Sequence, residues 1–267
     1  MKKNGMFIIP VVAVAIFALM NRTMYANGLN LKTILMIGII PFVLMILIRP
    51  KKSGGKVSAD TATSLLGDHA KDAFCHDPAL SAKFQSAVSD CFRSMPKSAQ
   101  KKLTELEPHC KNDVDTYAYC VAMGLVKFNL DDYEGAIKLY NKAVVLFPTA
   151  QLADSIGSCQ QRIGELEKAM DSYEFALDLE PDNLPIRAKL ATAYVADGNF
   201  EAGIEHAQMV LDQDENNASA LATIAICHGV LSNQDLYKGY TAKAVENGYN
   251  EQKITNTVTT LKKRFKK

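Results

Sequence analysis

One pattern of five residues occurs three times between residues 117 and 217, and it constrains the fold of this chain more than any other feature. The first copy has the order G-x11-A-x3-Y-x2-A-x4-P, and the second copy keeps the same internal spacing. The pattern residues are Gly124, Ala136, Tyr140, Ala143 and Pro148, then Gly157, Ala169, Tyr173, Ala176 and Pro181, and in a looser third copy Ala191, Gly203, Ala207, Val210 and Glu215. Ala136 to Ala169 is a step of 33 residues, and Ala169 to Gly203 is a step of 34. A fixed period of this size predicts stacked structural repeats.

Each copy contains two apolar-periodic segments of helix length, separated by a short polar turn. In the second copy we expect helices over 150–162 and 166–179, with the turn at Gly164, because glycine accepts the positive φ that ends a helix. The small residues allow the two helices to approach closely, and Pro181 ends the second one. A single helical hairpin cannot bury its own apolar face, so the copies must stack.

The small, aromatic and proline positions together resemble the tetratricopeptide repeat (TPR). The resemblance implies an all-α fold, a TPR-like α-solenoid of stacked helical hairpins. Its repeats occupy 117–149, 150–183 and 184–217, and a degenerate fourth copy occupies 218–249. Ile254, Val258, Leu261 and Phe265 recur at helical spacing, so residues 250–267 are predicted to form a capping helix with a basic tail.

Residues 58–116 precede the repeats and are helical in character without the repeat pattern. Asp77-Pro78 is a helix-start signal for a helix over 79–92, and a second helix is expected over 97–106. These two helices should cap the stack on its N-terminal side. A further helix is expected over 58–74.

Two apolar runs near the N-terminus predict a membrane anchor over residues 1–50. Residues 6–20 and 33–48 contain no charged side chain, and we expect spanning helices at about 6–20 and 31–48. A cleaved signal peptide is the alternative for the first run, but bulky Met24 stands where a small residue is needed before the cut. Arg49, Lys51, Lys52 and Lys56 follow the second run, which predicts a multi-pass protein of the cell membrane with its repeats in the cytoplasm. Residues 51–57 are expected to be a flexible linker.

The six cysteines, Cys75, Cys91, Cys110, Cys120, Cys159 and Cys227, are predicted to be buried reduced thiols rather than disulfides. A zinc site formed with His69, His76 and His109 is disfavoured, since the sequence has no CxxC or HxxxH spacing. We therefore expect no metal and no cofactor. A thiol- or metal-responsive sensor in the region before the repeats stays open as an alternative function.

Charge and motifs exclude several functional classes. Residues 1–56 hold eight basic residues and no acidic one, and the last seven residues hold five more, so the body between carries 17 basic against 29 acidic residues. An acidic body argues against nucleic-acid binding. No nucleophile elbow, phosphate loop, dinucleotide fingerprint or zinc-hydrolase motif is found in the sequence, so an enzyme is not expected.

The resemblance implies a concave groove, lined by the first helix of each pair, that holds a segment of a partner protein. Counted from the repeat pattern, the groove residues are Val121, Leu125, Phe128, Gln151, Asp154, Ser158, Gln161, Arg162, Ala188, Thr192, Val195, Ala222 and Ile226. Of the positions that clamp a terminal carboxylate in chaperone-binding relatives, only Lys189 has a matching side chain here, so that ligand class is disfavoured. The alternative is that the apolar groove residues pack on the chain's own flanking helices.

The predicted function is therefore a membrane-anchored scaffold or adaptor that binds a partner protein through this groove. The basic tail, Lys262 to Lys267, has two interpretations. It either stabilises the end of its helix through the helix dipole or contacts anionic lipid next to the anchor.

Overall fold

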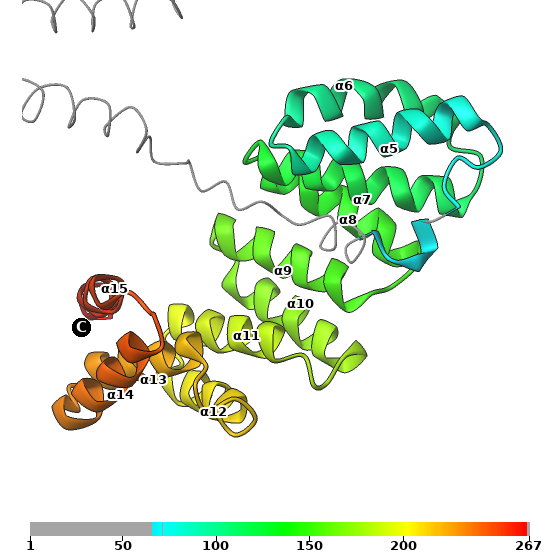
Figure 1. Cartoon of the computed structure of the whole chain (residues 1–267). Coiled ribbons are helices and arrows are strands. Elements are labelled where there is room, and N and C mark those ends of the chain that lie inside the picture. The colour runs from blue at the N-terminus through cyan, green and yellow to red at the C-terminus, as the bar shows by residue number, and fades with distance from the viewer. Residues whose placement is uncertain (1–65, 71, 266–267) are drawn as a thin grey trace, which may run out of the picture. The chain divides into compact units, whose positions relative to one another are not determined.

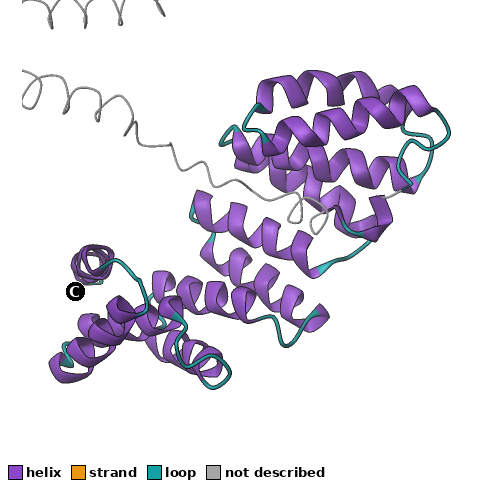
Figure 2. Ribbon diagram, in the orientation of Figure 1, coloured by secondary structure: helices purple, strands orange, loops and turns teal. Residues whose placement is uncertain are grey.

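A computed structural model describes residues 66–70 and 72–265, and this part of the chain is helical with no strand (Figures 1 and 2). Two short 3-10 helices are η2 (Asp68–Ala70) and η3 (Glu107–His109). The α-helices are α5 (Pro78–Phe92), α6 (Pro96–Leu106), α7 (Asp113–Asn129), α8 (Tyr133–Leu146), α9 (Ala150–Ile163), α10 (Leu166–Leu179), α11 (Leu184–Asp197), α12 (Phe200–Leu211), α13 (Ala218–Val230), α14 (Gln234–Glu246) and α15 (Glu251–Arg264).

Polar side chains and glycines set the ends of the repeat helices. Thr149 caps α9 by accepting a hydrogen bond from the Leu152 N–H, and Asn183 caps α11 in the same way. Gly164 ends α9 with φ 84° and Gly198 ends α11 with φ 97°, both in the left-handed region. The helices predicted over 150–162 and 166–179 are thus confirmed to within one residue.

The recurring glycine and tyrosine of the pattern meet where the two helices of a pair cross. A Cβ added to Gly124 would lie 2.5 Å from the Tyr140 ring, and one added to Gly157 would lie 2.8 Å from the Tyr173 ring. Tyr140 and Tyr173 are both fully buried. The tyrosine therefore fills the space that the missing glycine side chain leaves.

Successive helices pack against one another along the chain, from α5–α6 through α13–α14 (Figure 1). The helices α5 and α6 pack on α7 and bury Phe84, Leu103 and Leu106. This confirms the predicted cap on the first repeat. The degenerate fourth repeat forms the helix pair α13–α14. The amphipathic helix α15 follows it as expected, with Ile254, Val258 and Leu261 buried.

The helix predicted over 58–74 does not extend to its predicted end, because the chain leaves the α-helical conformation after Leu66. Residues 67–70 and 72–74 form η2 and turns, and Phe74 has a positive φ of 59°. The Phe74 N–H donates a hydrogen bond of 2.6 Å to the carboxylate of Asp115, which is buried at the start of α7. Asp115 also accepts from the Lys111 N–H at 3.2 Å. This tertiary contact fixes the segment in a non-helical path.

Several predictions fall outside the described residues. These are the spans at 6–20 and 31–48, the linker at 51–57 and the first part of the helix at 58–74. Within 66–70 and 72–265, no helix combines the length and the apolarity that crossing a membrane requires.

Candidate functional site

The predicted groove residues lie on the face formed by the first helices α7, α9, α11 and α13, here called the groove face. The chain itself covers this face at both ends. Four of the predicted residues are buried, namely Val121, Val195, Ala222 and Ile226. A partner cannot reach them in this structure, which corrects the predicted groove.

At the N-terminal end, segments from before the repeats cover α7. Leu66, Val88 and Phe92 surround Val121 and Leu125, leaving a gap of only about 10 Å³ between them. Val121 and Leu125 are therefore part of the core that joins the cap to the first repeat.

At the C-terminal end, α15 covers α13. Its buried side chains Ile254, Val258 and Leu261 share one apolar cluster with Val195, Ala222 and Ile226. For these residues the structure bears out the alternative reading, in which groove residues pack on the chain's own flanking helix.

Between the two covered ends a hollow of about 450 Å³ stays open, and we call it the central groove. It is lined by Phe128, Ser158, Gln161, Arg162, Tyr173 and Lys189. Four of these residues were predicted from the repeat pattern. The repeat pattern does not predict Tyr173 or Lys189 as groove residues, although the place of Lys189 one turn before Thr192 on α11 indicates the same face.

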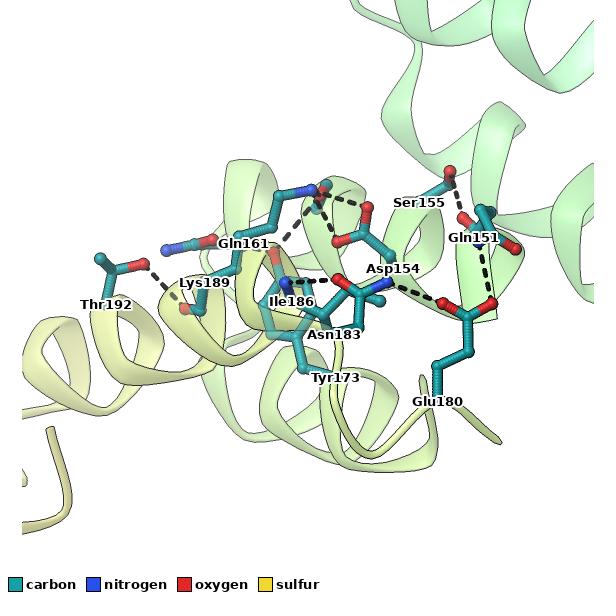
Figure 3. Close-up of polar contacts among 11 residues, drawn as sticks. Gln151, Asp154, Ser155, Gln161, Tyr173, Glu180, Asn183, Ile186, Lys189 and Thr192 are labelled. Carbon is teal, nitrogen blue, oxygen red and sulfur yellow. Dashed lines mark hydrogen bonds and ion pairs between the residues drawn. The ribbon is translucent and has the colours of Figure 1, made fainter. Parts of the chain in front are cut away.

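A hydrogen-bond network fixes the polar side of the central groove (Figure 3). The Lys189 ammonium donates to both carboxylate oxygens of Asp154, at 2.6 and 2.7 Å, and thereby joins α11 to α9. The Tyr173 hydroxyl donates to Gln161 Oε1 at 3.0 Å and to Ser158 Oγ at 3.4 Å. Burial raises the pKa of Tyr173 to about 12, so its hydroxyl remains a neutral donor.

The other predicted groove residues take part in local contacts. Gln151 donates to Glu180 at 3.0 Å, and Glu180 in turn accepts from Asn183 at 2.7 Å (Figure 3). The Thr192 hydroxyl donates to the backbone carbonyl of Lys189. Ala188 is half-buried against the core between α11 and α13. These residues shape the neighbourhood of the central groove without lining it.

The charge of the central groove is positive on balance. Lys189 is neutralised by Asp154, whereas exposed Arg162 forms no ion pair with another described residue. The hydrogen bond to Asp131 raises the pKa of Tyr133 and burial raises the pKa of Tyr173, and the positive charge of Arg162 offsets a small part of each shift. The groove thus presents an aromatic ring, Phe128, on one helix and a guanidinium donor on the next.

Most of the cysteines are buried and chemically protected. All six are free thiols, and four of them, Cys91, Cys120, Cys159 and Cys227, are buried. Burial raises the pKa of Cys91, Cys159 and Cys227 to about 12, which keeps them as unreactive thiols at neutral pH. Among the described residues, no three His, Cys, Asp or Glu side chains are grouped to hold a metal ion. These observations give no support to the sensor alternative.

Comparison with known sequences places repeats in the same part of the chain. Residues 117–149 and residues 162–227 match family models of the tetratricopeptide repeat. Sperm-associated antigen 1 of Rattus norvegicus is 26% identical over 108 residues, which are 40% of this chain and 12% of that protein. Protein PHOX1 of Arabidopsis thaliana is 33% identical over 100 residues, which are 35% of this chain and 13% of that protein. The chain spans about an eighth of the length of these curated relatives.

Solved structures share the helical stack. A tetratricopeptide repeat protein from Parabacteroides merdae aligns with a TM-score of 0.61 and 16% identity, covering 69% of this chain and 73% of that one. MamA from Desulfovibrio magneticus aligns at 0.53 with 21% identity, covering 72% and 99%. YrrB, described as a TPR protein with an unusual peptide-binding site, aligns at 0.54 with 15% identity, covering 68% and 90%. The chain contains tetratricopeptide repeats, and its described part is a TPR-like helical solenoid.

Proposed function

We propose, from the tetratricopeptide repeats and the central groove, that the chain is a membrane-anchored scaffold that binds a segment of a partner protein. The observation that carries the proposal is the hollow of about 450 Å³ between the two covered ends of the groove face. Its volume lies within the roughly 300–1,000 Å³ typical of ligand pockets. Peptide binding in YrrB, a structure of similar fold, supports the same use of the face here.

The lining of the central groove indicates what the partner segment contains. Phe128 offers an apolar contact, and its ring packs edge-on against Tyr133 at 5.5 Å, which holds it in place. Arg162 offers charge-assisted hydrogen bonds on the neighbouring helix. A short segment with one apolar anchor and one polar or charged group matches both. Because both ends of the face are covered, the segment that fits is short.

The groove assignment can be tested with a charge reversal at an exposed position. We expect Arg162→Glu in the full chain to weaken partner binding at least about tenfold, which corresponds to about 1.4 kcal/mol, and to change its salt dependence. The matched control is Lys142→Glu, an exposed charge reversal on α8 outside the groove. Co-purified proteins are identified by mass spectrometry for the wild type and both variants.

Two results would count against the groove. The first is an Arg162→Glu protein that retrieves the same partners as the wild type with unchanged helical circular dichroism. The second is an equal loss in the Lys142→Glu control, which would assign the effect to overall charge. Phe128→Ala provides a second test, since it removes the apolar contact without changing charge.

The membrane anchor is part of the proposal and is supported by the charge-free runs at 6–20 and 33–48. The basic cluster that follows them supports a cytoplasmic position for the repeats. A C-terminal alkaline phosphatase fusion tests this orientation, because the enzyme matures only outside the cytoplasm. We expect an inactive fusion. A fully active fusion would show that the repeats lie outside the cytoplasm.

A further inference from the structure

The helix α15 covers the groove face instead of extending the stack. Of the helices that precede it, a first helix such as α13 packs more on the second helix just before it, α12, than on α11. For α15 the order is reversed, since it packs mainly on α13 and only slightly on α14. Its place on the groove face is the place of a ligand helix.

The surface under α15 is shaped to receive its side chains, and we call it the α15 seat. It consists of Val195, Gly198, Ala222, Ile226 and Gly229. A Cβ on Gly229 would lie 2.7 Å from Val258 Cγ2, and a Cβ on Gly198 would lie 2.7 Å from the Phe265 ring. The Phe265 ring also packs edge-on against Phe200, with 5.7 Å between ring centroids. The two glycines therefore leave room for a β-branched residue and an aromatic residue at defined places.

The attachment of α15 is apolar. The side-chain hydrogen bonds of α15 all stay within the helix and its cap, as with the Thr257 hydroxyl, which donates to the Lys253 carbonyl at 2.8 Å. No ion pair links α15 to another described helix. Four threonines in fourteen residues make it a poor helix on its own. The seat, rather than its own sequence, keeps α15 helical.

We infer that the α15 seat is a binding site for an amphipathic helix of a partner protein, and that α15 is its exchangeable occupant. The partner helix carries aliphatic side chains at i, i+4 and i+7 and an aromatic side chain at i+11, as Ile254, Val258, Leu261 and Phe265 do. Helix-in-groove recognition uses anchors at this spacing.

Continuity of the groove face favours a partner over a second copy of this chain. Lys189, Thr192 and Val195 follow one another along one face of α11, so the central groove leads directly into the α15 seat. Binding of a partner helix requires that α15 leaves the seat in one molecule only. Exchange of α15 between two copies requires that the linker between α14 and α15, Asn247–Asn250, opens in both molecules at once. The inference stands apart from the proposed function, because its test uses a peptide of this chain and no unknown partner.

The test is binding of a fluorescent peptide of residues 249–265 to the full chain. In the wild type, the tethered α15 competes for the seat at an effective concentration on the order of 1 mM. If the free peptide has an intrinsic Kd of about 10 µM, its apparent Kd for the wild type is therefore raised roughly a hundredfold. Ile254→Asp in the full chain should release α15 and restore tight binding. Thr255→Asp, on the exposed side of the same helix, should leave binding as weak as in the wild type. A peptide with Phe265→Ala should bind at least about tenfold less well to the Ile254→Asp chain.

Hydrogen exchange of the same proteins shows directly whether α15 is bound to the seat or released from it in each variant. We expect α15 amides to exchange at least about tenfold faster than α13 amides in the wild type, and without protection in the Ile254→Asp chain. A released α15 with no peptide binding would overturn the inference, and so would an α15 that stays protected in that variant. A dimer formed by exchange of α15 between copies would overturn the assignment to a partner helix.

Discussion

Gly157→Ala tests whether the glycine–tyrosine contact holds the second repeat together. The new methyl group would lie 2.8 and 2.9 Å from two carbons of the Tyr173 ring and 3.1 Å from the backbone oxygen of Ala169. The ring is fully buried and its hydroxyl is hydrogen-bonded, so it cannot move aside without disturbing Gln161. Overpacking of this kind costs about 1–3 kcal/mol.

The helix propensity of alanine opposes this cost. Replacing glycine by alanine inside a helix stabilises it by about 1 kcal/mol. The net loss for Gly157→Ala is therefore about 0–2 kcal/mol. Gly239→Ala is the matched control, because it lies inside α14 with no atom within 4 Å of the added Cβ. That variant should gain up to about 1 kcal/mol.

The difference between the two variants isolates the steric cost, which should be about 1–3 kcal/mol. Urea unfolding of the full chain, followed by far-ultraviolet circular dichroism, measures it from the shift in midpoint at constant slope. Equal stabilisation by the two substitutions would refute the contact between Gly157 and Tyr173. A loss in both would refute the open environment of Gly239.

Three further predictions concern the cap, the histidines and the thiols. Asp115→Ala leaves the buried Phe74 N–H unpaired, so it should cost about 1–3 kcal/mol and speed proteolysis between residues 67 and 77; an unchanged digestion pattern would show that this hydrogen bond does not hold the segment. Burial, with Arg187 nearby, lowers the pKa of His206 below its usual 6.5, so the unfolded chain takes up the proton first and stability should fall as pH drops below about 6.5. His206→Gln should flatten that dependence, and an equally steep curve would exclude His206 as its source. Exposed Cys75 should react first with a thiol reagent, whereas Cys159 should react only on unfolding, as mass spectrometry of labelled peptides would show.

The repeats could be predicted because their determinants are local. Gly157, Ala169 and Tyr173 lie within one period of the sequence. Their sizes, two small residues and one large ring, match a close crossing of the two helices of a pair. The path of the chain before α5 could not be predicted, since it depends on a hydrogen bond from Phe74 to Asp115, 41 residues later. No pattern within residues 58–74 reports that contact.

The central groove was predicted in part. Counting repeat positions found Phe128, Ser158, Gln161 and Arg162, because groove positions follow from helix periodicity. It could not show which positions the flanking segments cover, since the amphipathic pattern of α15 predicts a buried face but not the surface against which it packs. The apolar character of Ala222 and Ile226, where an open groove would favour polar side chains, was the available signal.

The order of helix contacts has a consequence for how the chain folds during synthesis. Almost every packing partner of a helix is its neighbour in sequence, so each pair can form as soon as it leaves the ribosome, without waiting for distant segments. The largest exception is α15, which packs more on α13 than on its sequence neighbour α14. The surface of α13 under α15 therefore stays uncovered until α15 itself has left the ribosome. Newly made copies thus pass through a stage in which this apolar surface is accessible to chaperones.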